Sequence, residues 1–315
     1  MCKIIICMKV IEVKNLVKKY GDLAAVNDIS FHVNKGEIFG LLGENGAGKT
    51  TTLEMAEGLR KPTSGNIKVL GHDTQSELSD IKGKIGVQLQ SSAYYGFLTL
   101  IEILDLFGSF YNKQVDPDKL LEMVDLKDKA KSYVNNLSGG QKQRFSIVAS
   151  LVNDPEVVFL DEPTTGLDPL ARRRLWDLIT QIKAQGKTII LTTHYMEEAE
   201  LLCDRIAIMD KGKIVAMDET YKLIEGTKHP FKITFIDKNI DKKTSDELKK
   251  LGVLNELGGK SFHFEETFST KEALNKAIDL IRANSPETLT VTKSSLEDVF
   301  VELTGRRIGE DENSD

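Results

Sequence analysis

Residues 43–51 read Gly-Glu-Asn-Gly-Ala-Gly-Lys-Thr-Thr, and the stretch Glu-Ile-Phe-Gly-Leu-Leu at 37–42 runs directly into them. Glycines spaced this closely let backbone N–H groups turn inward around phosphate oxygens, in conformations that a Cβ would hinder. A helix expected to begin near Lys49 adds its positive N-terminal end. The stretch therefore predicts a strand, a phosphate-binding loop and a helix, which together begin an α/β nucleotide-binding domain.

Within this loop, two side chains have a predicted chemical role. Lys49 can reach the β- and γ-phosphates of a nucleotide, and the Thr50 hydroxyl can ligate Mg²⁺. The residues expected to bind the cofactor ATP are Gly43, Glu44, Asn45, Gly46, Ala47, Gly48, Lys49, Thr50 and Thr51. A plain glycine-rich turn is the alternative, and the strand and helix patterns on either side argue against it.

A second apolar run, Val-Val-Phe-Leu at 157–160, ends in the carboxylates of Asp161 and Glu162. Ligands of open α/β folds bind at the carboxyl ends of the strands. Asp161 is therefore expected to hold Mg²⁺, directly or through water, and Glu162 to act as the base that polarises the attacking water. Acidic residues at a strand end alone more often cap a helix, and only the phosphate loop upstream favours catalysis.

A third motif, Leu-Ser-Gly-Gly-Gln at 137–141, precedes a helical run. The Ser138 side chain and the amides of Gly139 and Gly140 at a helix start make a second anion site. Two phosphate-type sites and one phosphate loop predict a head-to-tail dimer, with each ATP between the loop of one subunit and this turn of the other. An ordinary N-cap is the better interpretation of this motif in isolation.

These motifs, in this order, resemble the ATP-binding subunit of an ABC transporter over about residues 9–226. The resemblance implies a P-loop NTPase fold of the RecA-like type, with ATP and Mg²⁺ as cofactors. It implies that Tyr20 stacks on adenine, that Gln90 meets Mg²⁺ and the attacking water, and that His194 contacts the γ-phosphate. Across the dimer interface it implies nucleotide contacts from Ser138, Gly139, Gly140, Gln141 and Asp168.

Each implied residue also has a simpler interpretation. Tyr20 could be a surface aromatic at a turn, and His194 a histidine satisfied near a strand end. Gln88 stands two residues before Gln90, so the choice between them rests on the family pattern. Residues 166–169 could be a turn before a helix that begins with proline. The agreement of all these motifs in sequence order favours the catalytic interpretation.

Strand patterns alternate with helical patterns along the first two thirds of the chain, which predicts a mostly parallel sheet. Residues 93–152 lack strand signals and are expected to form a helical subdomain, with helices over 98–111 and 117–133. The remaining expected parts are an N-terminal extension at 1–8, in which Met8 is an alternative start, a small α+β accessory domain at 227–305, and an acidic tail at 306–315.

The composition limits the classes of partner and the compartment that this chain is expected to have. The 315 residues carry a net charge of −6 with a pI near 5.6, which argues against a nucleic-acid partner. Three scattered cysteines provide neither a disulfide framework nor a zinc site and indicate a reducing, cytosolic setting. No uninterrupted apolar run reaches the roughly 18 residues of a membrane span.

An ATPase of this type without membrane spans requires a separate integral-membrane permease, and a second ATPase subunit that is either identical or a paralogue. Tyr94, Tyr95 and Phe97 are expected to line a groove for a cytoplasmic helix of the permease, or else to form the core of the helical subdomain. The chain is expected to be cytoplasmic and peripheral on the inner face of the cell membrane.

The stretches Tyr195–Glu200 and Ser294–Phe300 resemble ATPases that pair with ABC-2 exporters of drugs, antibiotics or lipids, which favours export. An import ATPase is the nearer alternative. A soluble ABC-type ATPase acting on DNA is less favoured, because the interval between Lys49 and Asp161 is too short for the coiled coil of such relatives. A ribosome-associated relative would carry two cassettes, whereas this chain carries one.

Overall fold

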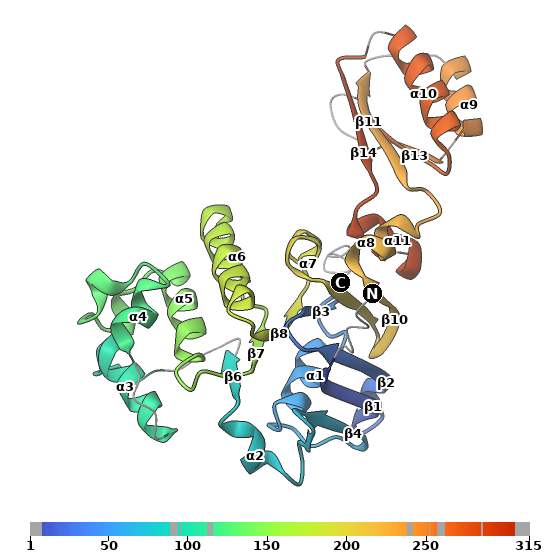
Figure 1. Cartoon of the computed structure of the whole chain (residues 1–315). Helices are drawn as coiled ribbons and strands as arrows, with labels where there is room; N and C mark the ends of the chain where they lie inside the picture. The colour runs from blue at the N-terminus through green and yellow to red at the C-terminus, as the bar shows by residue number, and fades with distance from the viewer. Residues whose placement is uncertain are drawn as a thin grey trace, which may run out of the picture. The chain divides into compact units, whose positions relative to one another are not determined.

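The computed structural model divides into two compact units between Asp218 and Glu219, each described here by itself (Figure 1). The residues that the structure describes are 8–88, 94, 96–111, 116–237, 242–251, 253–256, 262–284 and 286–305. The expected extension before Met8, the acidic tail at 306–315 and Gln90 lie outside them.

The centre of the first unit is a six-stranded sheet in the order β10-β9-β3-β8-β7-β6. Its strands are β3 (Ile38–Leu42), β6 (Ile85–Gln88), β7 (Val157–Asp161), β8 (Thr188–Thr193), β9 (Arg205–Asp210) and β10 (Lys213–Glu219). The four central pairings, from β9 to β6, are all parallel. Every residue of β3, β7 and β8 is buried, as their continuous apolar runs predict for parallel strands covered on both faces.

A second, antiparallel sheet has the order β2-β1-β4-β5. Its strands are β1 (Lys9–Tyr20), β2 (Leu23–Asn34), β4 (Ser64–Val69) and β5 (His72–Asp73). Phe31 of β2 stacks on Phe39 of β3 with ring centroids 5.2 Å apart, so one core joins the two sheets. Helix α1 (Lys49–Ala56) contacts strands of both sheets, which fixes the start of this helix at the carboxyl end of β3.

The remaining helices of the first unit cover the parallel sheet and extend beyond it. They are α2 (Leu78–Lys82), α3 (Leu100–Phe110), α4 (Pro117–Glu122), α5 (Gly139–Ala149), α6 (Pro169–Ala184) and α7 (Met196–Leu202). Helices α3, α4 and α5 contact one another and gather beyond the β6 edge as a helical subdomain (Figure 1). The continuous helix expected over 117–133 is wrong: α4 ends early because Asp125 adopts a left-handed φ of 54° and Leu126 N–H donates to Leu121 O.

The second unit is built around an antiparallel sheet in the order β12-β13-β11-β14. In chain order its elements are α8 (Thr220–Glu225), β11 (Phe231–Asp237), α9 (Lys242–Leu251), β12 (Val253–Glu256), β13 (Phe262–Phe268), α10 (Lys271–Ala283), β14 (Thr288–Lys293) and α11 (Leu296–Thr304). The βαββαβ order with this strand arrangement is the ferredoxin-like motif. Strand β12 has no counterpart in the elements expected from the sequence.

The core of this second unit lies between its sheet and the helices α9 and α10. Thr270 caps α10 by accepting a hydrogen bond from Ala273 N–H, and Leu274, Ala277 and Ile281 on one face of that helix are buried. They pack with Ile233 and Phe235 of β11 and with Leu248 of α9. Among the residues that the structure describes, no helix is long and apolar enough to cross a bilayer.

Candidate functional site

The glycine loop is shaped by contacts that a side chain would break. Gly48 is the N-cap of α1 with φ 99°, and a Cβ there would lie 2.3 Å from the carbonyl oxygen of Ala25. A Cβ on Gly43 would lie 2.3 Å from the carbonyl oxygen of Met209. The loop therefore passes close to two other backbones, and glycine is required at both positions.

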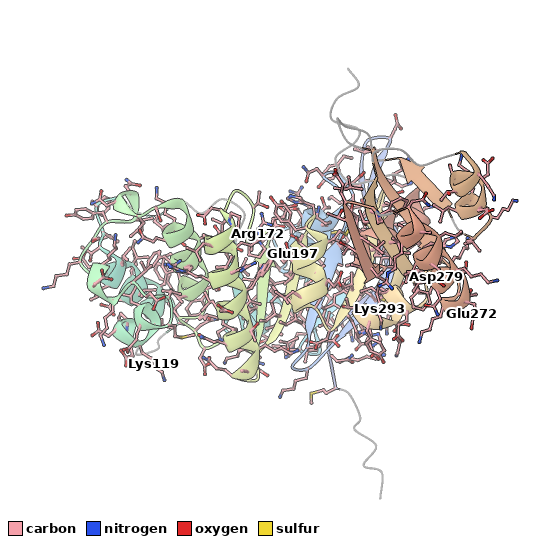
Figure 2. All side chains as sticks on the ribbon, turned by 90° about the horizontal axis from the view of Figure 1, so that it is seen from above. Lys119, Arg172, Glu197, Glu272, Asp279 and Lys293 are labelled. Carbon is pink, nitrogen blue, oxygen red and sulfur yellow. The ribbon has the colours of Figure 1, made fainter. Side chains whose placement is uncertain are left out.

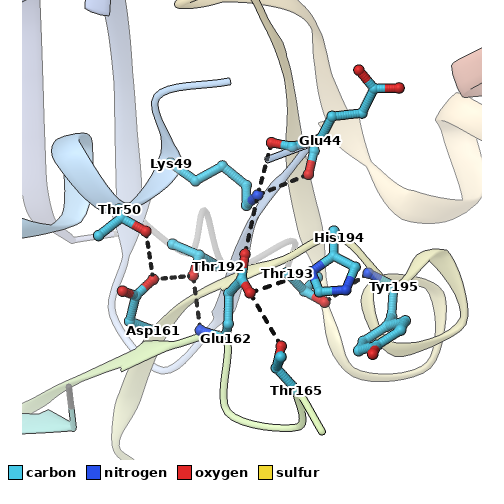
Figure 3. A network of polar contacts seen from close by, with 11 residues as sticks. Glu44, Lys49, Thr50, Asp161, Glu162, Thr165, Thr192, Thr193, His194 and Tyr195 are labelled. Atoms are coloured by element: carbon cyan, nitrogen blue, oxygen red, sulfur yellow. Dashed lines mark hydrogen bonds and ion pairs between the residues drawn. The ribbon is translucent and has the colours of Figure 1, made fainter. Parts of the chain in front are cut away.

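The other loop residues differ in exposure. Asn45 and Gly46 are exposed, Ala47 is buried, and Glu44, Thr50 and Thr51 are half-buried. Lys49 is buried and its ammonium donates to the carbonyl oxygens of Gly43 at 2.8 Å and Glu44 at 3.0 Å, so it bends back over the loop (Figure 3). Burial lowers the pKa of Lys49, and the nearby carboxylate of Glu162 opposes that shift.

Side chains from three segments contact the buried Glu162 carboxylate: Lys49 at the start of α1, Thr165 after β7 and His194 after β8 (Figure 3). Its Oε1 lies 3.2 Å from Lys49 Nζ, and its Oε2 lies 3.3 Å from His194 Nδ1. Thr165 Oγ1 donates to the same Oε2 at 3.1 Å. The contact with His194 lowers the pKa of Glu162 most; burial opposes it and Lys49 lowers it further, to about 2.

The backbone of Glu162 is strained. Its φ is 44°, in the left-handed region that costs a residue with a Cβ about 1–3 kcal/mol. The surrounding structure holds this conformation, because Glu162 N–H donates to Thr192 Oγ1 at 2.9 Å. The turn directs the carboxylate toward the loop and away from the end of β7 (Figure 3).

Asp161, the last residue of β7, lies beside the start of α1. Its Oδ1 accepts hydrogen bonds from Thr50 at 3.1 Å and from Thr192 at 2.5 Å. Burial raises the pKa of Asp161, and the two threonine hydroxyls oppose that shift. A carboxylate and a threonine hydroxyl in contact at a phosphate loop are oxygen ligands that suit Mg²⁺.

The Leu-Ser-Gly-Gly-Gln motif begins α5 with a reciprocal capping box. Ser138 Oγ accepts from Gln141 N–H at 3.4 Å, and Gln141 Oε1 accepts from Ser138 N–H at 2.9 Å. Ser138 and Gly139 are exposed, Gln141 is half-buried, and a Cβ on Gly139 would meet nothing within 4 Å. The turn is thus an N-cap with an exposed first residue, and among the described residues neither Ser138 nor Gln141 has a hydrogen bond to the network around Glu162.

Asp168 is the N-cap of α6, and its Oδ1 accepts from Leu170 N–H and Ala171 N–H at 3.0 Å each. Pro169 begins the helix, and Gly166 turns the chain before it with φ 75°. Tyr20 ends β1 with its ring 43% exposed, and its hydroxyl accepts from Arg60 at 2.5 Å. These two residues also lie apart from the Glu162 network.

The aromatic segment before α3 divides between two environments. Tyr94 packs edge-on against Phe145 with ring centroids 5.4 Å apart and also contacts Phe107, so it belongs to the core of the helical subdomain. Phe97 is 75% exposed. Tyr95 and Gln90 lie outside the described residues.

Two threonines in the network have no counterpart in the sequence predictions. Thr192 bridges Asp161 and the Glu162 backbone, and Thr165 contacts the Glu162 carboxylate. The signal for Thr192 is its position, since a hydroxyl ends the apolar strand β8 beside β7. Nothing in the sequence distinguishes Thr165 from a solvent-facing turn residue.

Comparisons with known proteins agree with this site. A sequence profile described as ABC transporter matches residues 26–165. The Nod factor export ATP-binding protein I of Burkholderia lata is 37% identical over 305 residues, covering 95% of this chain and 98% of the relative. The protein of that name from Cupriavidus pinatubonensis is 35% identical over 95% of this chain and 92% of its own length.

This chain belongs to the ATP-binding subunits of ABC transporters. Among solved structures, an ATP-binding subunit of an ABC transporter superposes with a TM-score of 0.62 at 31% identity, covering 69% of this chain and 92% of that one. An ATP-binding cassette solved as a dimer with ADP and Pi in a post-hydrolysis state gives 0.61 at 28% identity, over 66% and 98%. The protein is thus an ATP-binding and ATP-hydrolysing transporter subunit with the P-loop NTPase fold.

Proposed function

We propose that this ABC subunit powers export through a separate membrane permease, and that two ATPase subunits close head to tail around two ATP. The observation that carries the hydrolytic part is the buried Glu162 carboxylate between Lys49 and His194, beside the Thr50–Asp161 pair. Export is supported by relatives named for export that match 95% of this chain. The subunit is then peripheral on the inner face of the membrane.

In this proposal the loop amides and Lys49 bind the β- and γ-phosphates. Thr50, Asp161 and Gln90 hold Mg²⁺, which shields the phosphate charge. Phosphate oxygens take the place of the Glu162 carboxylate at Lys49, because the three N–H donors of its ammonium already contact Gly43 O, Glu44 O and Glu162, so one of these acceptors has to be displaced. Glu162 thereby loses a cationic neighbour and gains an anionic one, which raises its pKa from about 2 and makes it a better base for the attacking water.

The other side of each nucleotide comes from the second subunit, which is either a copy of this chain or a paralogue. Ser138, Gly139, Gly140 and Gln141 present the exposed start of α5 to the γ-phosphate, and Asp168 lies at the same interface. The exposure of Ser138 and Gly139, with no hydrogen bond from this turn to Glu162 among the described residues, supports a site shared between subunits. Tyr20 supplies an exposed ring for the adenine.

Substitution of the base tests the hydrolytic part. Glu162→Gln keeps the size of the side chain and removes its proton acceptor, so we expect turnover to fall by about 10²-fold or more while ATP still binds. The variant should elute as a dimer with Mg-ATP and as a monomer without it. Lys49→Ala should abolish turnover and form no such dimer, because the phosphate contact is lost.

An exposed carboxylate provides the control, since Glu156→Gln lies just before β7 and should behave as the unmodified protein. Substantial steady-state hydrolysis by purified Glu162→Gln would overturn the assignment of the base. A dimer that forms equally well with and without Mg-ATP would overturn the shared site.

The exposed Phe97 is the residue that we propose for the permease surface. Phe97→Asp should lower the amount of permease that co-purifies with the subunit by about tenfold, because a charge cannot enter an apolar contact without cost. Phe110→Asp is the matched control, since Phe110 is 66% exposed at the other end of α3. Mass spectrometry of the co-purified membrane proteins identifies the partner, and equal recovery with both variants would contradict this surface.

A further inference from the structure

A fully buried carboxylate, that of Glu198, lies one helical turn beyond His194. It occupies the third position of α7 and has 0% exposed surface. The indole Nε1 of Trp176 on α6 donates to Glu198 Oε1 at 3.1 Å. Because a buried carboxylate without partners is costly, its partners define what it holds together.

The first set of partners leads to His194. Thr193 Oγ1 accepts from Tyr195 N–H at 2.9 Å, which leaves its single O–H proton free to be donated. That hydroxyl lies near the Glu198 carboxylate; burial raises the pKa of Glu198 and the hydroxyl lowers it, but no hydrogen bond joins these two described groups. His194 is therefore flanked by two residues, Thr193 and Tyr195, that are connected to each other, and Thr193 lies near Glu198.

The His194 ring is supported in a second way. Its centroid lies 4.1 Å from that of the Tyr195 ring, and the Arg172 guanidinium covers Tyr195 at 4.3 Å. Arg172 comes from α6, one turn before Trp176, and its charge acts on Glu198. Figure 2 labels Arg172 on α6 and Glu197 on α7, two helices that contact each other. Two side chains of α6 thus hold the segment that carries His194.

The second set of partners leads to the segment after Glu162. Thr164 has 0% exposed surface, and its hydroxyl lies near the Glu198 carboxylate, although neither Thr164 Oγ1 nor Glu198 Oε2 has a hydrogen-bond partner among the described residues. The next residue, Thr165, donates to the Glu162 carboxylate at 3.1 Å. The segment then reaches Asp168 and the start of α6, the helix that carries Trp176.

We propose that Glu198 is a positioning residue for ATP hydrolysis: it joins α6 to α7 and thereby keeps His194 and the Thr164–Asp168 segment in one arrangement around Glu162. Among the described residues, Glu198 has no hydrogen bond or ion pair with the loop or with the carboxylates of the site, so it acts through the segments that carry His194 and Thr164. This inference rests on the proposed role of His194 and adds the group that fixes it. A displacement of about 1 Å in such a group lowers a rate by up to about 10²-fold.

Replacement of Glu198 by an apolar residue of similar length tests this role in the full chain. Glu198→Met removes the acceptor of Trp176 and the carboxyl group near Thr193, and we expect kcat with Mg-ATP to fall by about tenfold while the ATP dissociation constant changes by less than about twofold. Glu198→Gln keeps one acceptor oxygen, so its kcat should fall less than that of Glu198→Met. Glu197→Met changes the exposed neighbour on α7 and should leave kcat unchanged.

A spectroscopic measurement separates positioning from a general structural effect. The chain has five histidines, so ¹³C-labelled histidine gives a simple NMR spectrum in which His194→Ala identifies the His194 signal. Glu198→Met should shift that signal and leave the other four in place, and Glu197→Met should shift none. A Glu198→Met protein with unchanged kcat, or with lowered kcat and an unmoved His194 signal, would overturn the inference.

If Glu198→Met does not fold, Trp176→Phe carries the same two measurements, because it removes only the indole donor and keeps an aromatic ring against α7. We expect a smaller fall in kcat and a smaller shift of the same signal, and no change in either would overturn the inference. Full activity of His194→Ala would instead refute the proposed role of His194. That outcome is independent of whether the His194 signal responds to Glu198.

Discussion

At the scale of single residues, the site depends on where carboxylates are buried and what faces them. Glu162 is buried between two cationic or hydrogen-bonding groups, and its pKa falls to about 2. Glu57, at the end of α1, is buried with neither carboxylate oxygen hydrogen-bonded to a described residue. Burial, and then the negative charges of Asp161 and Glu54, raise its pKa from 4.5 to about 8.

This difference predicts how stability depends on pH. The folded state keeps the Glu57 proton up to about pH 8, whereas the unfolded chain releases it near pH 4.5. The contribution of Glu57 to the free energy of unfolding is therefore most favourable below pH 4.5 and is lost as the pH rises toward 8. Glu57→Met should raise the free energy of unfolding at pH 8 by about 1–3 kcal/mol and flatten its decline between pH 5 and 8. Urea unfolding at several pH values measures both, and a decline as steep as that of the unmodified protein would contradict the burial argument.

Of the three scales, that of single residues was also the most predictable from the sequence. The glycine loop, Asp161 and Glu162 come from short motifs, and His194 was implied by the family resemblance; the structure brings Lys49, Glu162 and His194 together. Thr192 and Thr165 were not predicted, because a threonine at a strand end or in a turn is common and carries no spacing signal. The left-handed φ of Glu162 was equally invisible, since it depends on contacts from β8.

At the scale of elements, buried apolar runs and capping signals were sufficient to predict a strand or helix where local chemistry decides the structure. The strand β7 coincides with the apolar run at 157–160 and extends it to Asp161, and the helix α6 begins at Pro169 behind its Asp168 cap, as the proline indicated. The helix expected over 117–133 failed because its end depends on one residue, Asp125, taking a left-handed conformation. Strand β12 was missed because a four-residue strand exists only through pairing with β13.

The start of α5 serves two purposes that substitution can separate. Ser138 caps the helix and, in our proposal, binds the γ-phosphate of the other subunit. Ser138→Ala should cost about 1 kcal/mol of stability together with most of the ATPase activity. Ser138→Asp should retain the cap and the melting temperature but lose the activity, because its carboxylate repels phosphate. An active Ser138→Asp variant would leave the motif with a capping role alone.

At the scale of the whole molecule, the chain combines a nucleotide-binding unit and a ferredoxin-like unit, each with its own buried core. Nucleotide binding stabilises only the unit that binds it, unless the two units unfold together. The single tryptophan of the chain, Trp176, is buried in the first unit and reports on that unit alone. Fluorescence and calorimetry therefore monitor different parts of the same molecule.

We expect heating to give two calorimetric transitions, with the Trp176 fluorescence change coinciding with one of them. Mg-ATP added to the Glu162→Gln variant, which does not consume it, should raise that transition by several degrees, as about 2.7 kcal/mol of stabilisation at a hundredfold excess over Kd implies. The other transition should stay in place. A single transition that follows the fluorescence and moves as a whole would show that nucleotide binding in the first unit is energetically coupled to the ferredoxin-like unit.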